Sequence, residues 1–180
     1  MNALQKLGRV LKKHRRCSNA APCCGAETAF HLSGIDMRRF HDIRRRYKDE
    51  APYPGHSKYL EIEQSLGQAV KRAHDLALHD LPPINILDVG TGSAYFPFVC
   101  ANYGHRCKAL DVPDIAMYNE LVALLKVDRT YWRVEPFVSI PDLGGHFDLL
   151  TAYRVCFNNH ATERVWGIDE WRFFLDDIFQ

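Results

Sequence analysis

A carboxylate and two glycines directly follow a short apolar segment near the middle of the sequence. The run Asp88-Val89-Gly90-Thr91-Gly92 closes the segment that begins at Ile84, and a second carboxylate, Asp111, lies 21 residues beyond Gly90. Glycines lack a Cβ, so they allow a tight turn and let a ligand approach the backbone closely. A carboxylate about 20 residues further on is placed to bind the hydroxyls of a ribose. The spacing therefore indicates a binding site for a ligand that contains a nucleoside.

The segments around these residues alternate between expected strands and expected helices. Aliphatic and β-branched runs predict strands at Ile84–Val89, Arg106–Val112, Tyr131–Val134 and Phe147–Ala152. Apolar residues at spacings of three and four predict helices over 57–77, 94–103, 114–126 and 171–178. This order is typical of an α/β fold with a mostly parallel sheet and helices on both faces. Such a sheet binds ligands beyond the carboxyl ends of its strands, where Asp88 and Asp111 are expected to lie.

Positive charge is concentrated in the first 48 residues, although the formal net charge of the chain is only +1. Of the 23 Lys and Arg residues 12 lie there, against three of the 22 acids. We expect a basic extension over residues 1–56, made of a first basic helix, a loop around Cys17–Gly25 and a basic amphipathic helix after Asp36. Residues 57–180 are then expected to form the ligand-binding domain.

Several roles are open to this basic extension. It could steer an acidic substrate, contact an anionic membrane surface, cover the acidic body or form a lid. It lacks the interleaved aromatic residues that stack on bases, so nucleic acid is not the partner that we expect. We expect residues 36–79 to pack beside the site, with His56, Lys58 and Tyr59 near its mouth.

The composition is that of a chain with a hydrophobic core. Hydrophobic residues make up 47% and charged residues 25%, which excludes wholesale disorder. No apolar run approaches 18 residues, so no transmembrane helix is expected. No signal peptide opens the sequence, and we therefore expect the six cysteines to be reduced thiols of a cytoplasmic protein. An organelle transit peptide or a membrane-surface helix is the alternative for the first 26 residues, which contain no acid.

Three cysteines and a histidine in the extension are candidate metal ligands. Cys17, Cys23, Cys24 and His31 could supply four ligands to zinc. Their spacing, C-x5-C-C-x6-H, is not that of the common zinc sites. We therefore expect no bound metal and unpaired thiols in a loop.

Three blocks of the sequence together resemble a known family. ILDVGTGSA, CKALDVPD and FDLLTAY are similar to the motifs of the Rossmann-like S-adenosylmethionine-dependent methyltransferases, over roughly residues 83–180. The resemblance implies S-adenosylmethionine as cofactor and methyl transfer to an acceptor, which we expect to be a small molecule. It implies that Asp88, Gly90, Thr91 and Gly92 hold the methionine end of the cofactor. It also implies that Asp111 binds the ribose, that Val112 packs on the adenine, and that Thr151, Ala152 and Tyr153 border the transferred methyl group.

The sequence departs from the family pattern at two positions. Ala94 stands where the family often has a third glycine, and Glu135 is the nearest counterpart of an adenine-facing acid after the third strand. A dinucleotide-dependent oxidoreductase is an alternative, but its G-x-G-x-x-G motif needs glycine at position 95, which is Tyr95 here. Asp88 also favours a ligand with a cationic amino group over a pyrophosphate. A non-catalytic or degenerate cofactor-binding domain is the other alternative.

Candidate catalytic residues follow the fourth expected strand. We predict catalytic roles for Tyr153 and His160, with Arg154, Asn158 and Asn159 nearby; the alternative for 158–160 is a solvated loop with a helix cap. A general base is needed only if the acceptor is a hydroxyl or a protonated amine.

The number of expected strands is small for this family. The resemblance implies a seven-stranded sheet, whereas four strands are predicted. We therefore expect the C-terminal strands to be missing from this chain, or a partner chain or second copy to cover the exposed edge of the fourth strand.

Overall fold

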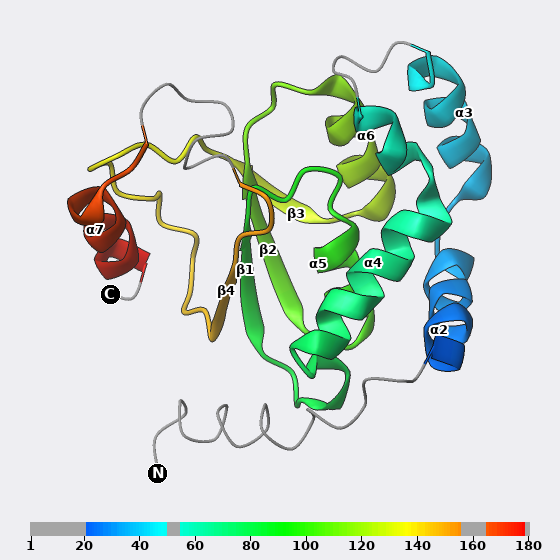
Figure 1. Ribbon diagram of the computed structural model, residues 1–180, viewed down its shortest axis with the longest axis horizontal. Helices are drawn as coiled ribbons and strands as arrows, with labels where there is room; N and C mark the ends of the chain where they lie inside the picture. Colours follow the sequence, from blue (N-terminus) through cyan, green and yellow to red (C-terminus); the bar gives the residue numbers. More distant parts are fainter. Residues whose placement is uncertain (1–20, 50–54, 156–164, 179–180) are drawn as a thin grey trace.

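A computed structural model describes residues 21–49, 55–155 and 165–178 (Figure 1). Its four strands form one sheet in the order β3-β2-β1-β4, and every neighbouring pair is parallel. The strands are β1 (Asn85–Val89), β2 (Arg106–Asp111), β3 (Asp128–Tyr131) and β4 (Leu149–Thr151). From β1 the chain adds β2 and β3 on one side and then crosses back to place β4 on the other side. This reversal creates a topological switch point at the carboxyl end of β1, where such sheets bind ligands.

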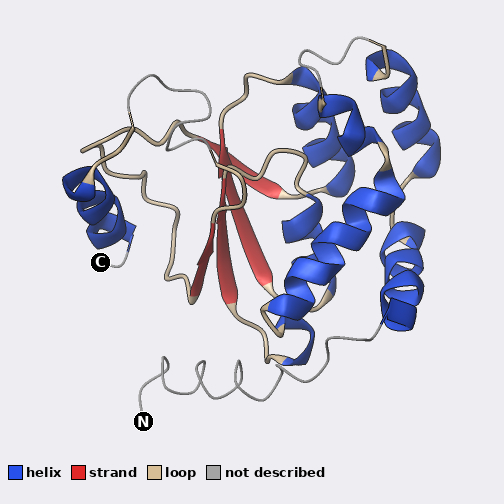
Figure 2. Cartoon of the chain, viewed as in Figure 1, coloured by secondary structure: helices blue, strands red, loops and turns tan. Residues whose placement is uncertain are grey.

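Helices flank this sheet, as predicted for the α/β class. Figure 2 shows α2–α6 grouped on one side of the strands and α7 on the other. The α-helices are α2 (Ala21–Ser33), α3 (Met37–Tyr47), α4 (Ile62–Asp75), α5 (Tyr95–Asn102), α6 (Ala116–Leu125) and α7 (Ile168–Ile178). Two short 3₁₀ helices, η2 (His56–Leu60) and η3 (Leu78–Asp80), stand before and after α4. The Rossmann-like parallel α/β architecture is therefore confirmed.

The central strand β1 is buried on both faces, because successive side chains of a strand point to opposite sides. Ile86 lies in the main core with buried residues of α3, α4, α5 and α6. Leu87 and Val89 lie in a smaller core on the opposite face, together with Leu110 and Leu143. The aliphatic run at 84–89 was correctly predicted to be a strand without an exposed face.

The third strand begins and ends earlier than predicted. β3 is Asp128–Tyr131, paired with β2 from Lys108↔Asp128 to Asp111↔Tyr131, and not Tyr131–Val134. Trp132 and Val134 lie beyond the strand and pack against the smaller core. The prediction was wrong because apolar alternation reports burial, and a loop that crosses a sheet face buries its apolar side chains as a strand does.

The N-terminal part contains a helix where a loop was predicted. Helix α2 begins at Ala21 and includes most of the stretch that was predicted to be a loop. Pro22 is tolerated there because the first turn of a helix needs no N–H donor. An apolar stripe in the sequence does not mark the buried face of this helix. Phe30 is exposed, and its fully buried neighbour is the polar His31.

The predicted helix over 57–77 is interrupted. Its first residues form η2, and α4 begins only after Glu61, whose φ of −92° and ψ of 81° are not helical. This break separates η2 from α4. The fourth strand is also shorter than predicted, with three residues in place of 147–152.

The basic helix α3 is anchored on the acidic body. Phe40 and Ile43 are buried in the main core. Arg46 and Tyr47 both bond to the Glu120 carboxylate of α6, the tyrosine hydroxyl at 2.8 Å. Helix α3 of the predicted extension thus packs on the body through α6, and the roles considered for the extension stay predictions. The expected first basic helix lies outside the described residues, and the boundary at 56/57 stays a prediction.

None of the helices in the described ranges combines the length and apolar character needed to span a bilayer.

Candidate functional site

A cavity of about 350 Å³ lies at the carboxyl ends of β1, β2 and β4. Its wall is formed by the turn after β1, the end of β2, one face of α4 and the segments that follow β3 and β4. Small-molecule sites in proteins have volumes of about 300–1,000 Å³. The cavity therefore has the size of a ligand site and lies at the topological switch point of the sheet.

The turn after β1 depends on glycine at two positions. Gly90 and Gly92 have φ angles of +69° and +55°, in the left-handed region that favours glycine. A Cβ on Gly90 would lie 2.8 Å from Cγ2 of Val155, so it would fill space that the wall already uses. The N–H of Gly90 donates to the carbonyl of Leu110 at 2.7 Å, which fastens the turn to β2.

Ala94, which stands at the family's third glycine position, shares this backbone conformation. Its φ is +62°, and it is the N-cap residue of α5. The alanine is fully buried. The backbone shape expected of a third glycine is thus kept, although a methyl group occupies the place.

The carboxylate of Asp111 joins the end of β2 to the glycine turn. Its Oδ2 accepts a hydrogen bond from the N–H of Gly92 at 2.6 Å, and its Oδ1 accepts one from the N–H of Val112 at 2.8 Å. Burial raises the pKa of Asp111, and the two backbone hydrogen bonds oppose that rise. Each carboxylate oxygen keeps a second lone pair directed elsewhere, so Asp111 can brace the turn and still accept from a ligand in the cavity.

Asp88 is the deepest charged group of the site. Its side chain is 4% exposed, and its Oδ1 accepts a hydrogen bond from Oγ1 of Thr151 at 2.7 Å. The two residues are partners in the β1–β4 register. Burial raises the pKa of Asp88 to about 6, while the hydrogen bond from Thr151 and the positive charge of Arg72 oppose the rise. A cationic group bound nearby would lower this pKa, because it favours the carboxylate.

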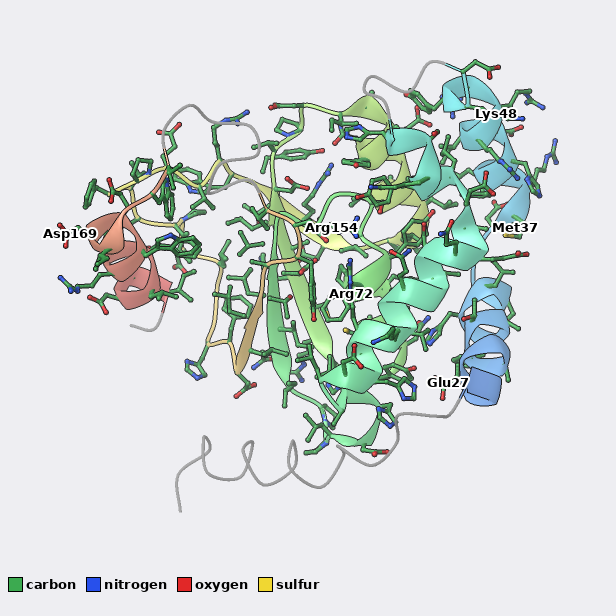
Figure 3. All side chains as sticks on the ribbon, in the orientation of Figure 1. Glu27, Met37, Lys48, Arg72, Arg154 and Asp169 are labelled. Carbon is green, nitrogen blue, oxygen red and sulfur yellow. The ribbon has the colours of Figure 1, made fainter. Side chains whose placement is uncertain are left out.

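Arg72 is a site residue that the sequence analysis missed. It lines the cavity from α4, and its guanidinium carbon lies 4.5 Å from the centroid of the Tyr153 ring (Figure 3). Ser65, Gln68 and Arg72 follow one another at spacings of three and four, so they share one face of the helix. This polar stripe was present in the sequence beside the apolar one and was a signal that could have identified the wall.

Tyr153 lies in the cavity wall, as expected from its place after β4. Its ring makes an edge-to-face contact with Phe96 at 5.2 Å, on the side of α5. Burial raises the pKa of Tyr153, so its hydroxyl stays protonated at neutral pH and can donate a hydrogen bond. The other predicted catalytic residue, His160, lies outside the described residues, as do Asn158 and Asn159.

An aromatic cluster from two segments contributes to the cavity wall and borders it. Tyr59 and Tyr118 line the cavity and meet edge-to-face at 5.4 Å, and the ring of His56 lies 5.4 Å from that of Tyr118. The hydroxyl of Tyr95 donates to the carbonyl of Tyr59 at 2.8 Å, which holds η2 against α5. Lys58 is exposed, with its Nζ 5.0 Å from the Tyr59 ring centroid.

Another part of the cavity wall is mostly apolar, although Arg133 also contributes to it. Val112, Ile115, Trp132 and Val134 line it, whereas Glu135 is exposed and does not. The indole Nε1 of Trp132 is buried, and no described residue accepts its hydrogen. A planar heterocycle would match this apolar surface. Ala152, expected at the methyl-transfer site, is exposed and does not line the cavity.

Of the four zinc ligands considered in the sequence, only His31 has a side chain that the structure describes, so the expectation about zinc stays a prediction. No group of three or more His, Cys, Asp or Glu side chains among the described residues is arranged to hold a metal ion. His31 is buried in α2, and its Nδ1 lies 3.0 Å from the amide nitrogen of Asn102. Cys17 falls outside the described residues.

The class that these features define is a Rossmann-like parallel α/β domain with a cavity at its switch point. No model of a protein family matches the sequence, and no curated protein matches it. Among solved structures, the chain is similar to the crystal structure of the S-adenosylmethionine-dependent methyltransferase SibL in its apo form, with 17% identity and a TM-score of 0.36. The match covers 93% of this chain and 49% of that one, so this chain spans about half the length of SibL.

Proposed function

We propose that the cavity binds S-adenosylmethionine and that the chain acts as an S-adenosylmethionine-dependent methyltransferase on a small-molecule acceptor. The observation that carries the proposal is the pair Asp88 and Asp111, set at the carboxyl ends of adjacent parallel strands on either side of a glycine turn. These two carboxylates face one cavity that also has an apolar wall. The arrangement supports a ligand with a cation at one end, a ribose in the middle and a flat base at the other.

The residues present fit the cofactor's parts. Asp88 would hold the amino group of the methionine portion beside Gly90 and Gly92, and Arg72 would hold its carboxylate. Asp111 would accept from the ribose hydroxyls. The adenine would pack on the apolar part of the wall that includes Val112 and Trp132.

Thr151 and Tyr153 have different parts in this proposal. When bound, the cofactor supplies an electrophilic methyl group on a sulfonium. Thr151 donates to Asp88 and so orients that carboxylate. Tyr153, which stays protonated, would donate a hydrogen bond to the acceptor and hold it in line with the methyl group, the positioning effect that lowers barriers most in such transfers.

Titration calorimetry with S-adenosylmethionine, S-adenosylhomocysteine and NAD tests the proposal. We expect the first two to bind and NAD not to bind. The Asp111→Ala change removes charge-assisted hydrogen bonds and should weaken the binding of S-adenosylhomocysteine by about 1.5–3 kcal/mol, roughly 10- to 150-fold. Asp111→Asn, which keeps the shape of the side chain, should weaken the binding of S-adenosylhomocysteine less than Asp111→Ala does.

Asp128→Ala is the matched control, because Asp128 is an exposed acid at the start of β3, the neighbour of β2, and does not line the cavity. This variant should bind S-adenosylhomocysteine as the wild type does. Binding of NAD alone would overturn the proposal. Unchanged affinity in a folded Asp111→Ala protein would overturn the ribose assignment.

A further inference from the structure

We propose that the acceptor carries an anionic group and that Arg154 binds it; this inference rests on the proposed methyltransferase function. Arg154 follows Tyr153 at the end of β4 and lines the cavity. The sequence predicts it only as one of several candidate polar groups after the fourth strand. The structure places it on the cavity wall as an exposed side chain without an ion pair to a described carboxylate.

The charges that line the cavity are three arginines and two carboxylates, and four of the five have a partner. Asp88 accepts from Thr151, and Asp111 accepts from two backbone N–H groups. Arg133 forms an ion pair with Asp114 at 2.5 Å, outside the cavity wall.

The remaining two charges are Arg72 and Arg154. Arg72 stacks on Tyr153 and is close enough to Asp88 to lower the pKa of that carboxyl. No carboxylate of the described residues pairs with Arg154. With Arg72 assigned to the methionine carboxylate, Arg154 is the cation left for the acceptor.

The backbone of Arg154 supports a functional role. Its φ is +58°, in the left-handed region that L-residues rarely adopt. Five non-glycine residues of the described chain share this feature, and Arg154 alone among them lines the cavity. Strained residues cluster at ligand sites, where surrounding structure maintains them.

The surroundings of Arg154 favour an anion over a neutral group. The hydroxyl of its neighbour Tyr153 stays protonated at neutral pH and can donate a hydrogen bond, which suits an anionic or carbonyl oxygen. The sulfonium of the bound cofactor would add a positive charge to the same cavity. Arginine binds carboxylates and phosphates with two parallel N–H donors, so either anion could be the group held.

Binding of small probes tests this inference without knowledge of the natural acceptor. The protein is first saturated with S-adenosylhomocysteine, and benzoate, phenyl phosphate and benzamide are then titrated by NMR. Benzoate and benzamide have nearly the same shape and differ in charge. We expect at least one of the two anions to bind ten-fold or more tightly than benzamide, and the tighter one identifies the anionic group.

Arg154→Gln should abolish the preference for the anion, whereas Arg154→Lys should keep part of it because the charge remains. Arg45→Gln is the control, since Arg45 is an exposed arginine of α3 that pairs with Asp42 away from the cavity. Failure of S-adenosylhomocysteine to bind would contradict the proposed function. Binding of S-adenosylhomocysteine with no preference for either anion, or with a preference that survives in Arg154→Gln, would overturn the inference and leave the proposed function intact.

Discussion

At the scale of single residues, the protonation of Asp88 should control both stability and ligand binding. Its pKa of about 6 in the folded chain is above the ordinary 3.8. The folded state therefore holds this proton more tightly than the unfolded state, so the contribution of Asp88 to stability is full below pH 4 and is lost as the pH rises through 6. The free energy of unfolding that Asp88 contributes at low pH and loses at high pH is about 3 kcal/mol. About half of this loss falls between pH 5 and pH 7.5.

Urea unfolding of the wild type and of Asp88→Asn at pH 5 and pH 7.5 measures this effect. The asparagine cannot titrate, so the wild type should lose about 1–2 kcal/mol more than the variant over that interval. Thr151→Val, which removes the hydrogen bond to the carboxylate but keeps the acid, should retain the pH dependence. A wild type and an Asp88→Asn protein with the same pH dependence would show that Asp88 is not a buried titrating group.

Loss of the same proton from Asp88, which lowers the stability of the fold, should strengthen ligand binding. A cationic amino group at Asp88 needs the carboxylate form, so affinity for S-adenosylhomocysteine should rise as the pH increases from 5 to 7 and then level off. In Asp88→Asn the affinity should be lower and nearly independent of pH over this range. A rise of the same size in the variant would place the titrating group elsewhere.

At the scale of elements, the turn between β1 and α5 is where sequence and structure agree most closely. Gly90 should not tolerate a side chain, for two separable reasons: its positive φ and the proximity of Val155. Gly104 offers the matched comparison, because it has a φ of +93° and nothing within 4 Å of an added Cβ. Gly104→Ala should therefore lower the free energy of unfolding only through the positive φ, by about 1–2 kcal/mol.

Gly90→Ala should cost more than Gly104→Ala, by about 1–3 kcal/mol for the added overpacking. Denaturant unfolding of the two variants measures this difference. The change Val155→Ala removes the two methyl groups that an added Cβ would meet, so the double variant Gly90→Ala/Val155→Ala should recover most of the extra loss. If Gly90→Ala and Gly104→Ala lose the same free energy of unfolding, Val155 does not limit which side chain the turn accepts.

The elements that sequence reasoning placed well are those whose signal is local. The aliphatic run of β1, its glycine turn and the acid at the end of β2 each depend on neighbouring residues, and each was predicted within one residue. Helix α2 was missed because its packing against α4 depends on polar contacts: Glu27 bonds to His74 and to the hydroxyl of Tyr103. Such contacts join residues far apart in sequence and leave no periodic pattern.

The same distinction applies to the site. Asp88, Gly92 and Asp111 were identified by type and spacing, whereas Arg72 reaches the cavity through the packing of α4 on α5, a tertiary contact. The indole of Trp132 was assigned to a strand in the sequence, although it lies in the cavity wall. A residue whose role depends on how two elements meet can be located only once their packing is known.

At the scale of the whole molecule, the described sheet has two edges, β3 and β4. The prediction that a partner chain or a second copy covers the β4 edge can be tested by hydrogen exchange. β1 has a strand on each side, whereas β4 pairs only with β1 among the described strands. Hydrogen exchange should therefore be slowest at 86–89 and faster at 149–151, because edge amides open with less disruption. S-adenosylhomocysteine should slow exchange at 90–92 and 111–112 without affecting 149–151.

A partner copy at the β4 edge would make exchange depend on protein concentration. Backbone pairing of two edges satisfies N–H and C=O groups that otherwise face solvent, so it should protect 149–151 only in the associated form. We expect exchange at 149–151 to slow as the concentration rises from micromolar to hundreds of micromolar, in parallel with a larger sedimentation coefficient, while exchange at 128–131 on the opposite edge stays constant. Exchange at 149–151 that is independent of concentration, with a single sedimenting monomer, would contradict self-association at this edge.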